Sequence, residues 1–399
     1  MSDFFQEQLQ ALRAQSLHRK LREIGTAQGP EIEIVGQQLV NFSSNDYLGL
    51  ANDPLLREAA IAGVAEFGVG AGASRLISGT QSPHLRLEAA LAKWKGTQAA
   101  LCFGSGYAAA VGTLPALVGK QDVVVLDKLC HASLIDGARL SGATIRVFPH
   151  NHLGKLESHL DWARRERPEA RVLVVTEAVF SMNGDRAPLR ALIGLKKRFG
   201  AMLLLDEAHS IGVIGANGRG LAAEENLTRE IDVQMGTLSK ALGVSGGYIC
   251  GSRTLIEWLV NRARSFIFST APPPALAVAA HAAVEFLASE AGEQRRQKLW
   301  ARVAVLRQCM AEHCAACLST REKGSAIHPL VIGDEQAALN LSRMLQHEGF
   351  LVPAIRYPTV PRDEARLRIT VTAAHDEKQI RRLAEAIGCH HAELTPIAA

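Results

Sequence analysis

Short runs of apolar residues recur through the middle of the chain, with amphipathic stretches between most of them. The runs are Ala99–Phe103, Val123–Leu126, Ile145–Phe148, Val172–Thr176, Met202–Leu205, Val233–Met235 and Tyr248–Cys250. Strands that are apolar without alternation are buried on both faces, and strands joined by helices form parallel sheets that helices cover on both sides. The pattern therefore predicts an α/β domain built on a parallel sheet, which we place at residues 51–285.

The two ends of the chain have other patterns. Residues 4–24 carry spaced apolar positions that predict an amphipathic helix, and residues 31–42 alternate around VGQQ as a hairpin does. After residue 285, helical sequence (290–317) is followed by a strand (326–332), a helix (335–347), a strand (366–371) and a helix (376–387). We therefore expect an arm at 1–50 and a smaller C-terminal α/β domain at 286–399.

Composition excludes several classes of protein. With 399 residues, 47% of them hydrophobic and 21% charged, the chain is a folded globular protein. Lys and Arg (44) nearly balance Asp and Glu (40), which argues against a nucleic-acid partner. The apolar stretch 272–288 is interrupted by His281 and Glu285 and is too short to span a membrane. The first residues lack the basic-then-apolar order of a signal peptide, so we expect a cytoplasmic protein.

Three cysteines have a spacing with two interpretations. Cys309, Cys314 and Cys317 form C-x4-C-x2-C, which some iron–sulfur proteins use, with Cys389 or His390 as a possible fourth ligand. The surrounding segment also reads as a helix with cysteines on its apolar inner face. The helical pattern favours the second interpretation, and we expect no metal.

A glycine-rich turn is the first candidate for chemistry. Gly104, Ser105 and Gly106 follow a predicted strand and open a predicted helix, whose N-terminus favours a phosphate. The same string fits G-x-G-x-x-A, and Asp127 follows about twenty residues later, as in dinucleotide-binding folds. An NAD-dependent oxidoreductase therefore remains an alternative from this segment.

Two further segments favour a phosphate-bearing cofactor other than a dinucleotide. Asp206 ends an apolar strand, where ligands of open parallel sheets bind, and His209 follows it. Lys240 follows another strand, and burial lowers the pKa of a lysine so that its neutral amine becomes a nucleophile. A phosphate loop, an acid and a nucleophilic lysine together are what pyridoxal 5'-phosphate (PLP) chemistry requires.

These residues lie in motifs that resemble a known family, the PLP-dependent α-oxoamine synthases of fold type I. The resemblance covers about residues 15–386 and includes NFSSNDYLGL (41–50), SGYAAA (105–110), HASLIDGARLSGA (131–143), VFSMNGD (179–185), DEAHSIGVIG (206–215), TLSK (237–240) and AIRYPTVP (354–361). It implies a large domain with a mostly parallel, seven-stranded sheet and a smaller C-terminal α/β domain. Ala110 and Ser239 depart from residues that are frequent in the family, and this leaves the acyl substrate open.

The resemblance assigns roles to individual residues. Lys240 matches the lysine that binds the cofactor and acts as general base, Asp206 the partner of the ring nitrogen, and His131 the catalytic imidazole stacked on the ring. The remaining matches to cofactor contacts are Gly106, Tyr107 and Thr237 near the phosphate, His209 at the phenolic oxygen, Ser181, and Ser269 and Thr270, which would reach the phosphate of a partner subunit in a homodimer.

Substrate-binding positions match in the same way. Arg368 would hold the amino-acid carboxylate. It lies at strand spacing from Arg366, and we expect one of the pair to be solvated. The other matches are Asn45, Thr359, His131 and Arg19 on the N-terminal helix, with Arg22 close enough to confuse the alignment. The implied activity is the decarboxylative condensation of L-alanine with a pimeloyl thioester, carried by CoA or acyl carrier protein, in biotin biosynthesis. A glycine C-acetyltransferase, an aminolevulinate synthase, a sphingoid-base synthase and a noncatalytic subunit remain alternatives, although the last is expected to lack the lysine.

Overall fold

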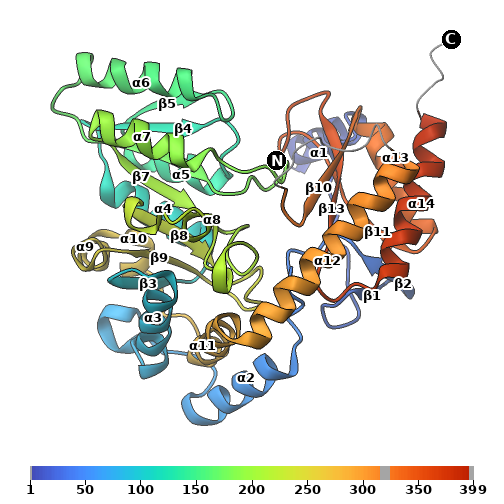
Figure 1. Ribbon diagram of the computed structural model, residues 1–399, viewed down its shortest axis with the longest axis horizontal. Coiled ribbons are helices and arrows are strands. Elements are labelled where there is room, and N and C mark those ends of the chain that lie inside the picture. The colour runs from blue at the N-terminus through green and yellow to red at the C-terminus, as the bar shows by residue number, and fades with distance from the viewer. Residues whose placement is uncertain (1, 315–323, 395–399) are drawn as a thin grey trace. The chain divides into compact units, whose positions relative to one another are not determined.

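The computed structural model describes residues 2–314 and 324–394 (Figure 1). The chain forms two compact units. The large unit comprises Leu50–Ser181 and Asp185–Arg296. The small unit takes its described residues from Met1–Gly49, Met182–Gly184 and Gln297–Ala399.

A seven-stranded sheet forms the centre of the large unit. Its strands are β3 (Ala99–Phe103), β4 (Val123–Asp127), β5 (Thr144–Phe148), β6 (Val172–Glu177), β7 (Met202–Asp206), β8 (Val233–Thr237) and β9 (Gly247–Gly251). The order is β3-β9-β8-β7-β6-β4-β5. β9 is antiparallel to β3 and to β8, and the other neighbouring strands of this sheet are parallel. The predicted mostly parallel, seven-stranded sheet is confirmed, and each strand lies within two residues of its predicted bounds.

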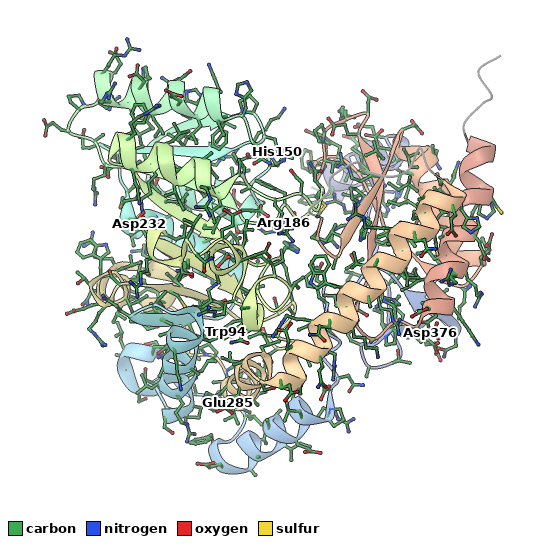
Figure 2. All side chains as sticks on the ribbon, in the orientation of Figure 1. Trp94, His150, Arg186, Asp232, Glu285 and Asp376 are labelled. Atoms are coloured by element: carbon green, nitrogen blue, oxygen red, sulfur yellow. The ribbon has the colours of Figure 1, made fainter. Side chains whose placement is uncertain are left out.

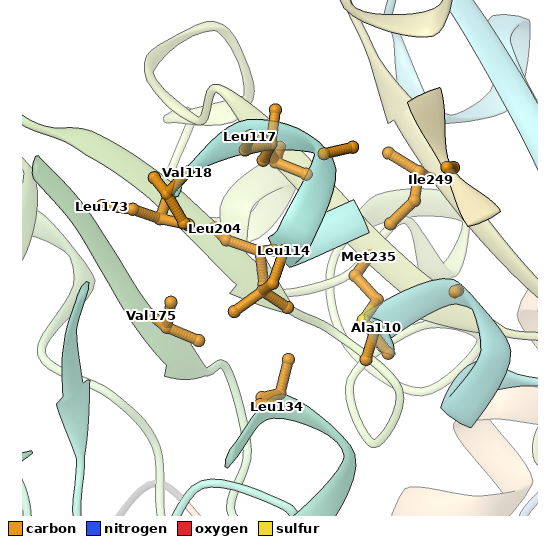
Figure 3. Packing of buried hydrophobic residues seen from close by; sticks show 14 of the residues in the cluster. Ala110, Leu114, Leu117, Val118, Leu134, Leu173, Val175, Leu204, Met235 and Ile249 are labelled. Atoms are coloured by element: carbon orange, nitrogen blue, oxygen red, sulfur yellow. The ribbon is translucent and has the colours of Figure 1, made fainter. Parts of the chain in front are cut away.

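Helices flank this sheet because successive side chains of a strand point to opposite faces. Val124 and Leu126 of β4 pack in the core that α4 and α5 share, whereas Val123 and Val125 pack in the core of α6 and α7. Figure 3 shows the first core, where Leu114 of α4 lies among strand residues. The helices of this unit are α2 (Pro54–Phe67), α3 (Ser82–Lys95), α4 (Gly106–Leu117), α5 (Ala132–Ser141), α6 (Leu153–Glu166), α7 (Leu189–Phe199), α8 (Leu221–Glu224), α9 (Arg253–Arg262), α10 (Arg264–Ile267), α11 (Pro274–Ala288) and the short turns η1 (Arg75–Gly79), η2 (Ala216–Gly218) and η3 (Thr228–Glu230).

Two three-stranded sheets organise the small unit. One has the order β1-β2-β11, with β1 (Glu31–Ile34), β2 (Gln37–Asn41) and β11 (Phe350–Leu351), and β11 runs parallel to β2. The other has the order β10-β13-β12, with β10 (Ile327–Gly333), β12 (Ala354–Ile355) and β13 (Ala365–Thr370). Its helices are α1 (Ser2–Ala14), α13 (Glu335–His347), α14 (Glu377–Leu394) and most of α12 (Glu290–His313).

The unit boundaries differ from the predicted domains in three places, and one of these is Met182–Gly184, which belongs to the small unit although it lies within the predicted domain 51–285. Residues 1–49 share a unit with the C-terminal part of the chain, because β2 pairs with β11. The last boundary lies after Arg296 and not after residue 285. It falls inside α12, which is continuous from Glu290 to His313, so this one helix belongs to both units.

The N-terminal helix is shorter than the pattern predicted. It ends at Ala14, and Ser16 adopts a left-handed conformation with φ of 57°. The N–H groups of Leu17 and His18 then both donate to the carbonyl of Leu12, which closes the helix end. Arg19 therefore lies in the segment after the helix, and its predicted helical position is wrong.

Two further observations concern alternatives from the sequence. No single helix in residues 2–314 and 324–394 is long and apolar enough to cross a membrane; α11 and α12 meet that test only as a pair, across a bend of 76°. Within the same residues, no group of three or more His, Cys, Asp and Glu side chains could hold a metal ion. Cys309 is buried on α12, and Cys317 lies outside the described residues.

Candidate active site

The glycine-rich turn places a helix N-terminus at the edge of a pocket. After β3, the Ser105 hydroxyl caps α4 by accepting a hydrogen bond from the N–H of Ala108 at 3.0 Å. A side chain at Gly247 on β9 would come within 2.5 Å of the Ser105 carbonyl, so the turn can lie on the sheet only because this residue is glycine. The first N–H groups of a helix have no intrahelical partner, and together they favour an anion.

The pocket beside this turn has a volume of about 240 Å³ and is formed by the large unit alone. It collects side chains from the carboxyl ends of β6, β7 and β8 and from the starts of α4 and α5. Its lining residues are Ser105, Gly106, Tyr107, His131, Ser133, Glu177, Asp206, Ala208, His209, Met235, Thr237, Ser239 and Lys240. Seven of the predicted cofactor-binding residues therefore line one cavity: Gly106, Tyr107, His131, Asp206, His209, Thr237 and Lys240.

Lys240 and His209 contact each other in this pocket. The half-buried Lys240 has its Nζ 2.8 Å from Nε2 of the buried His209. Thr237, which ends β8, turns its hydroxyl to the carbonyl of Gly246 at 2.9 Å and to Ser239 at 2.7 Å, so the segment before the lysine is held by side-chain hydrogen bonds. A lysine amine, an imidazole and a hydroxyl thus face one small cavity.

Two buried carboxylates end neighbouring strands of the sheet. Asp206 on β7 is directly opposite Glu177 on β6. Burial raises the pKa of Asp206, while the nearby Lys240 ammonium and the hydrogen bond from the N–H of Ala208 at 2.9 Å lower it. Burial and the Asp206 carboxylate together raise the pKa of Glu177. A second positive charge beside Asp206 would stabilise its carboxylate, and a protonated ring nitrogen is such a charge.

Glu177 is a site residue that the motifs did not single out. Its Oε1 accepts a hydrogen bond from the N–H of His131 at 2.5 Å, so it holds the start of α5. The sequence contained the same signal as for Asp206, since each is a carboxylate at the end of an apolar strand.

His131 lies at the start of α5 as its N-cap. Its Nδ1 is 2.8 Å from the hydroxyl of Ser133 and accepts from the N–H of Ser133 at 3.2 Å. These contacts fix the imidazole beside the pocket. Desolvation lowers the pKa of His131, although the Asp206 carboxylate acts in the opposite direction.

Three predicted cofactor contacts do not line this pocket. Ser181 is buried in the loop after β6. Ser269 and Thr270 are exposed, and Thr270 forms an isolated bridge with Ser74. The prediction that Ser269 and Thr270 act on a partner subunit concerns a second chain and stays a prediction.

The small unit brings together another set of predicted residues. Arg368 on β13 is buried, and its guanidinium donates to Asn45 at 3.0 Å and to the hydroxyl of Thr370 at 2.9 Å. Burial raises the pKa of the neighbouring Tyr47 hydroxyl, and the charge of Arg368 opposes this. Arg366 is buried as well and pairs with Glu364 at 2.9 Å, so the prediction that one of the two arginines is solvated is wrong.

Arg19 and Thr359 form a separate contact. The guanidinium of Arg19 donates to the hydroxyl of Thr359 at 3.4 Å, and both side chains are exposed. Arg22 is also exposed. The structure thus pairs the two residues that the resemblance assigned to substrate, although they are 340 positions apart.

The topology does not suit the dinucleotide alternative. In a Rossmann unit the strands before and after the first helix are parallel neighbours or flank one strand of the same direction. Here β3 is at the edge of the sheet and pairs only with the antiparallel β9. Asp127 is fully buried and accepts hydrogen bonds from the N–H groups of Leu129 and Asn151, both at 2.8 Å. It is therefore part of the scaffold.

The pocket residues fit PLP. A helix N-terminus with Ser105, Gly106 and Thr237 suits its phosphate, and a buried carboxylate with a raised pKa suits its pyridinium nitrogen. The amine of Lys240 opens to the same cavity and suits its aldehyde carbon.

Comparisons with known proteins agree with this geometry. The aminotransferase class I and II family matches residues 37–387. An 8-amino-7-oxononanoate synthase from Geobacter sulfurreducens is 46% identical over 380 residues, covering 95% of this chain and 96% of the relative. One from Anaeromyxobacter dehalogenans (strain 2CP-1) is 47% identical over 394 residues, covering 99% and 97%.

Solved structures give the same fold. A serine palmitoyltransferase from S. paucimobilis with a bound PLP–myriocin aldimine is 30% identical, with a TM-score of 0.91 and 98% of each chain covered. An 8-amino-7-oxononanoate synthase from Francisella tularensis is 26% identical, with a TM-score of 0.76, covering 89% of this chain and 98% of the other.

Proposed function

The chain belongs to the aminotransferase class I and II family, and from this premise we propose that it is a PLP-dependent acyltransferase of biotin biosynthesis. The reaction is that of an 8-amino-7-oxononanoate synthase. L-Alanine condenses with a pimeloyl thioester, and CO2 and the free thiol carrier are released. The identity of 46–47% over nearly the whole length of relatives with this name supports the assignment.

One observation carries the proposal on the structural side. The Lys240 amine lies in the same cavity as the buried Asp206 carboxylate and the start of α4. An amine nucleophile, a carboxylate that favours a positive ring nitrogen and a phosphate-binding helix end form the donor set that PLP chemistry requires.

In this reaction, each of the predicted site residues would have its own role. When bound, PLP supplies an electron sink for the negative charge at the substrate Cα. Lys240 removes and returns the Cα proton, and His209, at 2.8 Å, orients its amine. Asp206 would stabilise a proton on the ring nitrogen of bound PLP, and His131, which lines the same pocket, would pack on the ring. Arg368 takes the carboxylate of L-alanine through charged hydrogen bonds.

The proposal also covers assembly and location. Ser269 and Thr270 are exposed and do not line the pocket of their own chain, which is compatible with a role at the phosphate of a partner subunit in a homodimer. We place the enzyme in the cytoplasm, and either pimeloyl-CoA or pimeloyl-acyl carrier protein can serve as the donor in this scheme.

Product identification tests the function directly. The purified protein, loaded with PLP, is incubated with L-alanine and pimeloyl-CoA, and the products are identified by mass spectrometry. We expect 8-amino-7-oxononanoate with the wild type and none with Lys240→Ala, which should still bind PLP. Turnover at the wild-type rate by pure Lys240→Ala would contradict the role of this lysine.

A sphingoid-base synthase is the second candidate, because the serine palmitoyltransferase structure matches with a TM-score of 0.91. Its identity of 30% is well below that of the oxononanoate synthases. A panel of L-serine, glycine and L-alanine against palmitoyl-, acetyl- and pimeloyl-CoA separates the candidates. Preference for L-serine with palmitoyl-CoA would replace the proposed function.

A further inference from the structure

An ionic cluster outside the pocket holds a histidine between two aspartates. His150, which is labelled in Figure 2, lies two residues after β5. Its Nδ1 is 3.1 Å from Oδ1 of Asp127, and its Nε2 is 2.6 Å from Oδ2 of Asp185. Both aspartates are buried. Two ionised carboxylates only accept hydrogen bonds, so a doubly protonated His150 ring, with a proton on each nitrogen, matches both contacts. Burial by itself lowers the pKa of His150, but the hydrogen bonds to the two aspartates raise it to about 9.

The cluster ties two strand ends to the loop after β6. Asn151 donates from its backbone to Oδ2 of Asp127 at 2.8 Å. Its side-chain amide donates to Asp185 at 3.1 Å and to the carbonyl of Arg186 at 3.3 Å. The ends of β4 and β5 are therefore joined to Asp185 and Arg186 by several hydrogen bonds.

Asp185 and Arg186 belong to a hairpin of residues 178–187. The N–H of Phe180 donates to the carbonyl of Asp185 at 3.0 Å, and the N–H of Ala187 donates to the carbonyl of Ala178 at 3.1 Å. The Phe180 ring meets the His150 ring edge-on, with centroids 4.3 Å apart. The cluster thus fixes the foot of this hairpin.

The tip of the hairpin, residues 182–184, belongs to the small unit. The side-chain oxygen of Asn183 accepts from Arg366 of β13 at 2.6 Å. A side chain at Gly184 would lie 2.3 Å from the carbonyl of Ile327 on β10, so the tip packs directly on this strand. β10 pairs with β13, the strand that also carries Arg368.

We propose that His150 is a positioning residue for substrate binding: held by Asp127 and Asp185, it orders the hairpin 178–187, whose Asn183 accepts the hydrogen bond of Arg366, two residues before Arg368 on β13. This inference rests on the proposed function, because that function assigns the amino-acid carboxylate to Arg368. His150 itself does not line the cofactor pocket. Its loss should therefore affect the binding of L-alanine more than the binding of PLP.

The first measurement compares substrate and cofactor affinity in His150→Gln. We expect the KM for L-alanine to rise by roughly tenfold or more, with kcat and the Kd of PLP for the apoenzyme within about threefold of wild type. His159→Gln on α6 is the matched control, since this histidine is outside the cluster and hydrogen-bonds to the carbonyl of Val147, and it should behave as wild type. Asp185→Asn keeps the shape of the cluster and should produce the same pattern if His150→Gln does not fold.

The second measurement follows backbone hydrogen exchange and needs no substrate. In His150→Gln, peptides covering 178–187 and 365–370 should exchange about tenfold faster, while the α4 peptide 106–117 stays unchanged. Wild-type exchange in 365–370 together with a wild-type KM for L-alanine would overturn the proposal. Faster exchange everywhere, with PLP affinity lost in parallel, would also overturn it, because the role would then be general stability. A wild-type enzyme that makes no product from L-alanine refutes the proposed function, and the exchange measurement still decides the role of the hairpin.

Discussion

Nζ of Lys240 and Nε2 of His209 lie 2.8 Å apart, at the distance of a hydrogen bond. A protonated lysine offers only donors, so this contact requires either a neutral imidazole nitrogen or a neutral amine. In both cases one of the two groups can accept a proton. A lysine that must remove and return a proton is therefore already in contact with a second group that can donate or accept one.

Replacing Asp206 with Asn should slow proton removal more than it weakens cofactor binding. A neutral amide cannot stabilise a protonated ring nitrogen, and a change of one pKa unit corresponds to about 1.4 kcal/mol. We expect exchange of the Cα proton of L-alanine with deuterium, measured by NMR, to fall by at least about a hundredfold. Asp161→Asn on the exposed face of α6 is the control. Exchange at the wild-type rate in Asp206→Asn would mean that another carboxylate serves the ring.

Replacing Arg368 with Lys should weaken L-alanine binding. A hydrogen bond to a charged group contributes roughly 1.5–3 kcal/mol, and a lysine cannot form the paired bonds of a guanidinium. The KM for L-alanine should rise roughly ten- to a hundredfold, with little change in the KM for pimeloyl-CoA. The exposed Arg343→Lys should leave both values unchanged. An equal rise in both KM values would show that Arg368 does not bind L-alanine specifically.

Arg19 should matter for the far end of the acyl chain. Pimelate ends in a free carboxylate, and Arg19 is exposed beside Thr359. Arg19→Ala should raise the KM for pimeloyl-CoA roughly ten- to a hundredfold, the equivalent of one charged hydrogen bond, without affecting L-alanine. Heptanoyl-CoA lacks that carboxylate and should respond equally to wild type and variant. A loss confined to Arg22→Ala would assign the role to that residue.

The buried pair of Lys95 and Glu207 should contribute to stability next to the site. Nζ of Lys95 lies 2.5 Å from Oε2 of Glu207, and both side chains are almost fully buried. Removing one partner leaves a buried charge and typically costs about 3–5 kcal/mol, whereas replacing both can be nearly neutral. Lys95→Met should therefore lower the urea midpoint strongly, and Lys95→Met/Glu207→Gln should recover most of it. Equal midpoints for wild type and Lys95→Met would refute this role.

The pH dependence of stability should reveal the charge on His150. Its pKa is raised to about 9 in the folded protein, above the unfolded value near 6.5. The stabilisation is therefore complete below about pH 6.5 and disappears as the pH rises through about 9. The groups facing the ring are Asp127 and Asp185, with the neutral Asn151 and Phe180. The difference in Tm between wild type and His150→Gln should shrink from pH 6.5 to pH 10. A constant difference would show that His150 is neutral throughout.

The strands and the cofactor pocket could be predicted from sequence because their signals are local. An apolar run such as Met202–Leu205 identifies a buried strand, and the carboxylate of Asp206 at its end identifies the ligand edge of the sheet. The end of α1 could not be predicted in this way. The chain turns at Ser16 in a left-handed conformation, without the glycine or proline that usually marks such a turn.

The burial of Arg366 depends on tertiary structure. Arg366 and Arg368 are separated by one residue, so their side chains lie on the same face of the strand. In a strand at the protein surface, arginines at this spacing face solvent. β13 is instead the central strand of its sheet, and all six of its residues are buried. One of the acceptors of Arg366 is the side-chain oxygen of Asn183, which is far away in sequence and lies at the tip of the hairpin. No local pattern contains that information.

The pairing of β2 with β11 has a consequence for synthesis of the chain. Val40 on β2 has Phe350 as its partner, and this residue is translated about 300 positions later. At about 5–20 residues per second, the ribosome needs roughly 15–60 s to produce it. During that time the β1–β2 hairpin has an open edge, which is a site for pairing with other nascent chains. While the ribosome is still synthesising β11, the first fifty residues therefore depend on chaperones to prevent such pairing.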